Sequence, residues 1–349
     1  MPAKRTSAQD ESHIRDAALV LRSGGIVAFP TETVYGLGAD AFNAVAVAKV
    51  FEAKRRPSFD PLIVHVADPK ETARLWREVP PAAQKLMDAF WPGPLTLVLP
   101  KKDELPGIVT ADLDTVAVRM PRHDAALALI KALGSPIAAP SANVFGYTSA
   151  TSADAVMEDL GDKIDIVLDG GPAVIGVEST VLKIESGRAI LLRPGGTPVE
   201  EIKKFIPVDV PAASAAVESP GQTPSHYAPW TPFVASELEY PDIQKQLERL
   251  HKLFAEKEKP WPRIGILLFG ERKESPLFAN MEILSAKKNL SEAAAHLFGA
   301  IRKLDKMNLD LIIAENVPEK GLGLAIRDRL SKAAAGKRAV DSFFDNLLQ

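Results

Sequence analysis

The chain has 349 residues, of which 46% are hydrophobic and 25% charged; this leaves room for two domains of ordinary globular composition. It contains no cysteine, which excludes disulfide bonds, thiolate metal sites and cysteine nucleophiles and agrees with a cytoplasmic location. The net charge is -3, and residues 1–206 carry 23 Lys and Arg against 26 Asp and Glu, so neither half has the basic excess of a nucleic-acid-binding protein. Residues 1–22 lack the apolar core of a secretory signal, and no run of about 18 apolar residues predicts a membrane span.

Residues 1–206 alternate helix and strand patterns. Apolar periodicity predicts helices over residues 9–23, 43–53, 69–77, 81–89, 124–133 and from 151 onward. Apolar runs predict strands over residues 26–29, 62–66, 95–99, 116–120, 137–139, 166–168, 180–184 and 190–192. The short spacing of the last two predicts an antiparallel pair. We therefore expect an α/β domain with a mixed, twisted sheet.

Residues 207–232 have the composition of a linker, with prolines and no apolar periodicity. They also contain Ser225-His-Tyr-Ala-Pro229, which is unusually aromatic for a passive spacer. Beyond them, strand patterns alternate with helix patterns. Strands are predicted over 233–235, 264–269 and 309–314, and helices over 243–257, 291–306 and 324–335. This alternation predicts a smaller Rossmann-like α/β domain over residues 233–349.

The end of the first predicted strand carries an unusual polar cluster. The apolar run Ile26–Phe29 breaks at Pro30 into hydroxyls and a carboxylate, followed by two glycines. A hydrophobic core does not require such a break, and we interpret it as part of a ligand site, with glycines that let the backbone approach a neighbour. The residues of the cluster are Thr31, Glu32, Thr33, Tyr35, Gly36 and Gly38.

Three consecutive cations, Lys54 to Arg56, follow the second predicted helix and precede a strand that carries His65. They favour the dipole at the helix end, or they form a clamp for phosphate or carboxylate oxygens. His65 lies in a very apolar strand, so it is either a satisfied core residue or part of the site.

The strand Thr115–Met120 places Thr115, Ala117 and Arg119 on one face. A buried arginine needs a partner, which the sequence leaves open between Glu32, Asp114 and a ligand anion.

Two further strand ends carry hydroxyls. The loop Pro140-Ser-Ala-Asn143, continued to Ser149, suits phosphate oxygens or serves as a helix cap. Glu178-Ser-Thr180 and Arg193 add a carboxylate, hydroxyls and a cation. No phosphate-binding loop, complete dinucleotide fingerprint or nucleophile elbow occurs, so a nucleotide would be held by scattered Arg, Ser and Thr.

Taken together and in order, these motifs resemble the YrdC-like threonylcarbamoyl-AMP synthases over about residues 10–206. The resemblance rests on Pro30-Thr-Glu-Thr-Val-Tyr-Gly-Leu37, Lys54-x-Arg56-Pro57 through Pro61-Leu62, Trp91-Pro-Gly-Pro-Leu-Thr96, Arg119-x-Pro121, Pro140-Ser-Ala-Asn143 and Glu178-Ser-Thr180. The linker and C-terminal part resemble the long, two-domain form. Their motifs are Ser219-Pro-Gly221, His226-Tyr-Ala-Pro229, Gly321-Leu-Gly-x-Ala325 and Arg329-Leu-x-Lys332.

The resemblance implies a nucleotidyltransferase that condenses L-threonine, bicarbonate or CO2, and ATP into threonylcarbamoyl-AMP and pyrophosphate for tRNA modification. It implies a catalytic domain at 1–206, a linker or lid at 207–232 and a C-terminal domain at 233–349. The implied threonine-binding residues are Thr33, His65, Arg119 and Ser179. The implied ATP-binding residues are Arg56, Asp60, Thr115, Ala139, Ser141, Ser149, Arg193 and Tyr227, with Lys54 and Arg56 as catalytic cations. Asp60 stands where many relatives have Asn; it keeps the acceptor oxygens but adds negative charge.

We assign no protein metal ligands and expect Mg²⁺ to enter with ATP. His65 is a candidate acceptor of the threonine amine proton. We expect a monomer that hands its product to a separate tRNA threonylcarbamoyl-transfer complex, without membrane contact. Two alternatives stay open at this point. One is a nucleic-acid-binding module; the other is a regulatory or assembly role for the C-terminal domain, which shows no catalytic cluster.

Overall fold

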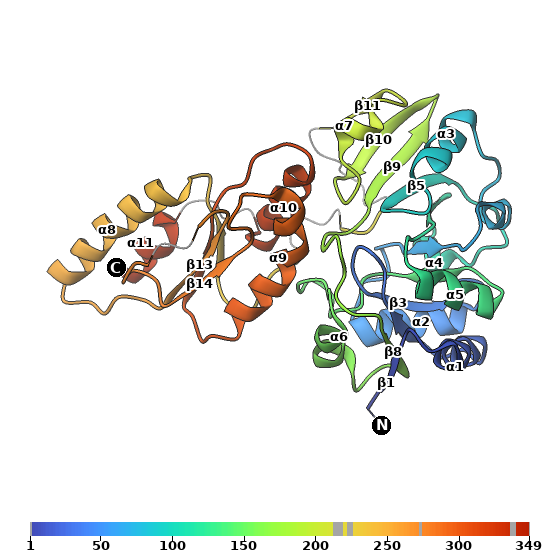
Figure 1. Ribbon diagram of the computed structural model, residues 1–349, viewed down its shortest axis with the longest axis horizontal. Helices are drawn as coiled ribbons and strands as arrows, with labels where there is room; N and C mark the ends of the chain where they lie inside the picture. The colour runs from blue at the N-terminus through green and yellow to red at the C-terminus, as the bar shows by residue number, and fades with distance from the viewer. Residues whose placement is uncertain (1, 212–218, 222–225, 272–273, 336–339, 349) are drawn as a thin grey trace. The chain divides into compact units, whose positions relative to one another are not determined.

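The computed structural model describes residues 2–211, 219–221, 226–271, 274–335 and 340–348. The chain divides into two compact units (Figure 1). The first comprises residues 1–145 and 149–223, and the second comprises residues 146–148 and 224–349. The predicted linker, residues 207–232, thus contributes to both units, and its role as a lid stays a prediction.

A mixed sheet of eleven described strands forms the centre of the first unit, in the order β1-β8-β2-β3-β7-β4-β6-β5-β9-β10-β11. This confirms the expected α/β class, and β9 and β10 form the expected antiparallel pair. The strands are β1 (Lys4–Ser7), β2 (Val27–Phe29), β3 (Gly36–Asp40), β4 (Ile63–His65), β5 (Leu95–Pro100), β6 (Thr115–Arg119), β7 (Ile137–Ala139), β8 (Ile166–Asp169), β9 (Thr180–Glu185), β10 (Arg188–Arg193) and β11 (Val208–Asp209).

Capping side chains and a glycine determine where several helices of this unit begin and end. The Asp10 carboxylate caps α1 by accepting from Ser12 N, and Ser152 caps α6 at the predicted start by accepting from Ala155 N. Gly134, with φ 75°, ends α5 in the left-handed conformation that glycine adopts readily. The helices are α1 (Glu11–Arg22), α2 (Ala44–Lys54), the 3-10 helix η1 (Pro69–Arg74), α3 (Pro81–Phe90), α4 (Gly107–Thr110), α5 (Asp124–Leu133), α6 (Ala153–Leu160) and α7 (Val199–Ile202).

The glycines at 36 and 38 lie inside a strand, which the sequence analysis missed. A Cβ atom on Gly38 would lie 2.5 Å from Cγ2 of Ile137 and 2.8 Å from Cε1 of Phe29. The neighbours that the two glycines approach are therefore side chains of the fold, and a ligand contact of either glycine stays a prediction. The glycines make room for the side chains of neighbouring strands, and this lets β3 pair closely with β2 and β7.

One face of the sheet is covered over part of its width by α1 and α5, which pack against each other (Figure 1). Their apolar residues share a buried cluster with Phe29, Ile137 and Ala139. Ala139 pairs with Ile63, which pairs with Ala117, and paired residues project to the same side of a sheet. The face that these helices cover therefore continues across β4, β6, β5 and β9, where a smaller apolar cluster consists of Ile63, Val98, Ala117 and Val181.

The second unit contains a four-stranded parallel sheet in the order β12-β15-β13-β14, as the Rossmann-like prediction requires. Its strands are β12 (Phe233–Ala235), β13 (Ile264–Leu268), β14 (Asn280–Ile283) and β15 (Leu311–Ala314). Its helices are α8 (Tyr240–Glu256), α9 (Leu290–Asp305), α10 (Leu322–Ala333) and α11 (Asp341–Leu348). The edge strand β14 was not predicted, because it is only half-buried and carries polar residues among apolar ones.

Within the described residues, no helix has the length and apolar character needed to cross a membrane.

Candidate functional site

The predicted threonine side is built around Arg119 at the end of β6. Arg119 is buried, and its guanidinium donates to Oγ1 of Thr33 at 2.9 Å and to the Gly93 carbonyl at 3.2 Å. Its Nη2 lies 2.6 Å from Oε2 of Glu32 in an ion pair whose side chains are both less than a tenth exposed. The partner that the sequence left open is therefore Glu32, and Thr33 and Arg119 are brought together as predicted.

Thr33 is held from both sides. Its hydroxyl lies 2.8 Å from that of Thr31, which donates to the Val34 carbonyl at 2.6 Å. The Tyr35 hydroxyl donates to the Gly171 carbonyl at 2.7 Å, so this part of the polar cluster is held in place by the fold. Fixed hydroxyls beside a buried guanidinium form a preorganised surface for a carboxylate and a hydroxyl.

His65 lies beside Arg119 across the β4–β6 pair. Burial, followed by the Arg119 charge, lowers the pKa of His65 to about 3, so the imidazole is neutral at pH 7. Its ring meets Phe29 edge-on at 5.8 Å, and its Nδ1 has no hydrogen-bond partner among the described residues. A base this weak is poorly suited to accept the proton of an ammonium group, whereas a neutral donor or acceptor beside Arg119 remains available to a ligand.

Ser179 and Arg193 are in direct contact at the start of β9 and the end of β10. The Ser179 hydroxyl lies 2.7 Å from that of Thr96, and Arg193 Nη2 donates to the same Ser179 hydroxyl at 3.2 Å and to its carbonyl at 2.9 Å. Arg193 Nη1 donates to the Pro220 carbonyl at 2.9 Å, so residues of the predicted linker reach the first unit here. Ser179, from the predicted threonine-binding set, is therefore in contact with Arg193, from the predicted ATP-binding set.

Lys54 closes α2 and holds the predicted nucleotide loop. Its buried ammonium donates to the backbone carbonyls of Ser141 and Asn143. Burial, followed by repulsion from Arg56, lowers the pKa of Lys54 well below its usual value. Lys54, which we predicted to contact the ATP phosphates, therefore also holds the loop that carries Ser141.

Arg56 and Asp60 form a second buried ion pair, with Nη2 of Arg56 2.8 Å from Oδ1 of Asp60 and both side chains almost fully buried. Arg56 also donates to the carbonyls of Asp60 at 3.0 Å and Pro61 at 2.9 Å, which staples the turn that leads into β4. Burial raises the pKa of Asp60, against the lowering by the charges of Arg56, Lys54 and Arg193. The positive charges of Lys54, Arg56 and Arg193 therefore all act on the Asp60 carboxylate.

The remaining predicted ATP-binding residues are distributed over the same unit, except one. Ala139 is buried in β7, and Thr115 is half-buried at the start of β6, opposite Pro100. The buried Ser149 hydroxyl donates to Oε1 of Glu178. Tyr227 belongs to the second unit, where its buried ring packs against Phe298 and lies under Arg329 at 5.1 Å. Its contact with a nucleotide stays a prediction.

Two acidic residues were not assigned a binding role from the sequence. Glu32 pairs with Arg119, and Glu178 accepts from Ser149. Glu32 follows the apolar strand β2 and Glu178 precedes β9, and each contacts a predicted binding residue. Among the described residues, no group of three or more His, Asp or Glu is arranged to bind a metal ion.

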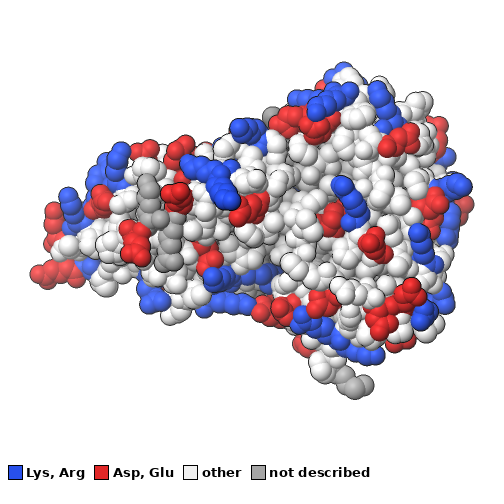
Figure 2. All heavy atoms as spheres, viewed as in Figure 1, with Lys and Arg blue, Asp and Glu red and all other residues white. Residues whose placement is uncertain are grey.

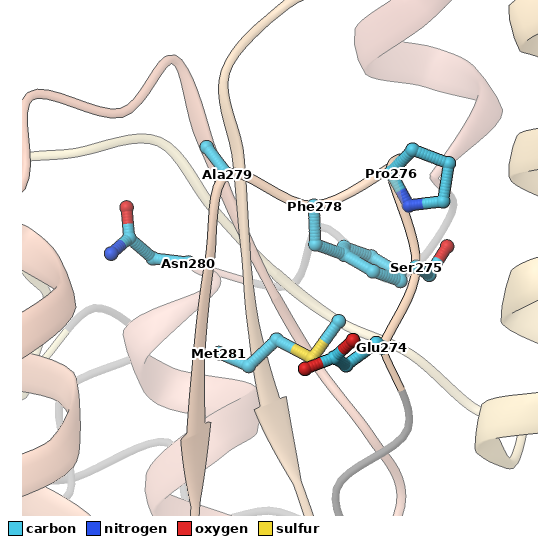
Figure 3. Close-up of a pocket in the computed structure, with 7 residues that line it drawn as sticks. All are labelled: Glu274, Ser275, Pro276, Phe278, Ala279, Asn280 and Met281. Carbon is cyan, nitrogen blue, oxygen red and sulfur yellow. The ribbon is translucent and has the colours of Figure 1, made fainter.

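A hollow in the second unit has different chemistry. Figure 3 shows the carboxylate of Glu274 near the side chains of Phe278 and Met281. The hollow measures about 390 Å³, and its described lining residues are Glu274, Ser275, Pro276, Phe278, Ala279, Asn280 and Met281. Among these described residues the charged one is an acid, so they do not by themselves form a site for a phosphate or a carboxylate.

Comparisons with known proteins agree over nearly the whole chain. A family model described as "Telomere recombination" matches residues 19–195, and one described as "Threonylcarbamoyl-AMP synthase, C-terminal domain" matches residues 197–335. A threonylcarbamoyl-AMP synthase of Pyrococcus abyssi is 44% identical over 93% of this chain and 95% of that protein, and one of Bacillus subtilis is 45% identical over 94% of each. The crystal structure of Pyrococcus abyssi Sua5 complexed with L-threonine matches with a TM-score of 0.87 and 43% identity, covering 97% of this chain and 98% of that one.

Proposed function

Because the chain belongs to the threonylcarbamoyl-AMP synthase family, we propose that it condenses L-threonine, bicarbonate or CO2, and ATP into L-threonylcarbamoyl-adenylate and pyrophosphate. The observation that carries the proposal is the contact between Ser179 and Arg193. It brings Ser179, which the resemblance assigns to threonine, against Arg193, which it assigns to ATP, in the same unit as the Arg119–Thr33 pair. Two ligands that must react with each other need adjacent sites.

Arg119 would bind the threonine carboxylate, with Thr33, Ser179 and His65 beside it. The amine of threonine attacks bicarbonate, forming an N–C bond and releasing water, which gives a carbamate. A carbamate oxygen then attacks the α-phosphorus of ATP, and the bond between that phosphorus and the bridging oxygen breaks as pyrophosphate leaves.

Negative charge grows on the phosphoryl oxygens during that step, and Lys54, Arg56 and Arg193 would stabilise it. Mg²⁺ bound to ATP would supply further charge neutralisation. The described residues offer no ready-made metal cage, so the ion would be held chiefly by the phosphate oxygens.

We test this with purified chain, ATP, Mg²⁺ and bicarbonate, by measuring pyrophosphate. Release is expected only when L-threonine is added, and L-serine serves as the matched control because it lacks only the methyl group. Release without threonine, or equal release with serine, would show that the substrate assignment is wrong.

The product would pass to a separate complex that modifies tRNA in the cytoplasm, with this chain acting as a monomer. A direct role in gripping RNA has less support, since Lys and Arg are interspersed with Asp and Glu on the face shown in Figure 2. Salt-sensitive tRNA binding without pyrophosphate release would favour that alternative.

A further inference from the structure

Asp60 is fully buried and has cations for its electrostatic partners. Its Oδ1 lies 2.8 Å from Nη2 of Arg56, and neither carboxylate oxygen accepts a hydrogen bond from a described residue. Hydrogen bonds to the backbone carbonyls of Asp60 and Pro61 fix Arg56, so the pair sits in a rigid turn. A buried carboxylate with no hydrogen-bond donors is costly to maintain, which suggests that its charge has a use.

The net charge of Lys54, Arg56, Arg193 and Asp60 determines which form of a nucleotide this group can bind. Arg56 and Arg193 each contribute one positive charge, and Lys54 contributes at most one because burial lowers its pKa. Asp60 removes one, and Glu178, whose charge also acts on Lys54, removes another, so the group carries at most about one net positive charge. Free ATP carries about four negative charges and its magnesium complex about two, so the group matches the complex far better.

We propose that Asp60 determines nucleotide specificity, by lowering the charge of the group of Lys54, Arg56 and Arg193 so that it binds ATP in its magnesium complex and disfavours the metal-free nucleotide. The inference rests on the proposed use of ATP. A resident carboxylate repels metal-free phosphates, and it also competes with them for Arg56.

The test is calorimetric binding of ATP, with Mg²⁺ or with EDTA, to the full chain and to Asp60→Asn. The full chain should bind the magnesium complex at least about tenfold more tightly than free ATP. Asp60→Asn should tighten free ATP by about tenfold or more and the magnesium complex by clearly less, so that the ratio of the two Kd values falls.

Three controls make the result specific. Asp209→Asn removes a carboxylate of the exposed pair with Arg188 and should leave both Kd values unchanged. An unchanged Kd for threonine shows that Asp60→Asn is folded. If it is not folded, Asp60→Ser, which is also neutral, is measured in the same way.

Equal affinity of the unaltered chain for free and magnesium-bound ATP would overturn the proposal, whatever the variants do. So would an unchanged ratio in the neutral variant. Weaker binding of only the magnesium complex by Asp60→Asn would overturn it in another way, by showing that Asp60 holds the metal. If no form binds ATP at all, the proposed function itself fails.

Discussion

Glu32 in the first unit and Glu315 in the second are both buried glutamates that follow a strand, yet their environments differ. Glu315 lies after β15, with Oε1 accepting from Tyr240 N at 3.0 Å and Oε2 accepting from Phe269 N at 2.7 Å. Glu32 is paired with Arg119 at 2.6 Å, and its Oε1 accepts no hydrogen bond from the described residues. One carboxylate is satisfied by backbone groups, and the other belongs to a charged network with spare bonding capacity.

The difference indicates where each unit can receive a ligand. The carboxyl ends of parallel strands are the usual binding place in an open α/β sheet. In the second unit Glu315 uses that place to tie β15 to the segments before α8 and after β13. In the first unit Arg119 and Arg193 each donate to a hydroxyl, of Thr33 and Ser179, and these groups are the ones that we propose contact the substrates.

Replacement of Arg119 should produce the largest effect. Arg119→Ala removes the cation proposed to bind the threonine carboxylate and leaves Glu32 buried without its ion-pair partner. The Kd for threonine should rise about 100-fold, with a much smaller change for ATP, as measured by calorimetry. Arg188→Ala, which breaks an exposed pair, is the matched control. A larger effect on ATP than on threonine would show that the two sites are assigned the wrong way round.

Arg193→Ala should have the complementary effect. It removes a predicted phosphate ligand while Ser179 keeps its contact with Thr96. The Kd for ATP should rise by about 30-fold and that for threonine by only a few-fold, because Arg193 also braces Ser179. Unchanged ATP binding would contradict the role of Arg193 and restrict it to structure.

The pKa of His65 predicts an acid-sensitive first unit. The folded pKa is about 3 and the unfolded value about 6.5, so the unfolded chain binds the proton more readily. Stability is fully present above pH 6.5 and is lost as the pH falls toward 3, by about 2 kcal/mol at pH 5. His65→Gln cannot titrate, so its unfolding free energy should fall by about 2 kcal/mol less between pH 7.5 and 5. Equal losses in both proteins would show that His65 is not neutral in the folded state.

The smallest effect is expected in the second unit. Glu315→Gln replaces one acceptor oxygen with an amide that cannot accept from a backbone N–H, which should cost about 1–2 kcal/mol of unfolding free energy in denaturant titrations. The Kd values for threonine and ATP should not change. A loss of ligand affinity without a loss of stability would mean that this carboxylate serves binding after all.

In both units the sequence predicted some helices and strands and missed others. The periodicity of apolar residues and the composition located the main helices and the apolar strands, because a buried face requires apolar residues at regular spacing. Among the elements that they missed are β3, where Phe29 and Ile137 fill the space above glycines, and the polar edge strand β14. Each of these depends on a neighbour that is distant in sequence.

The sequence named the residues of the candidate site, whose binding roles stay predictions, but it did not determine their pairings. The motifs indicated Arg119 and Lys54 as site residues. The structure was needed to show that Glu32 forms an ion pair with Arg119 and that Lys54 donates to the Ser141 carbonyl. Long-range partners of buried charges are set by the folded chain and have no local signal. This is why the sequence left Glu32 as one of several candidate partners of Arg119 and gave no partner for Glu178.

The most direct test of the central claim is to identify the product. The purified chain is incubated with L-threonine, ¹³C-bicarbonate, ATP and Mg²⁺, and the nucleotides are analysed by mass spectrometry. The account predicts an adenylate that contains both threonine and the labelled carbon, formed together with pyrophosphate. Formation of only AMP or ADP, or of an adenylate without the label, would contradict it.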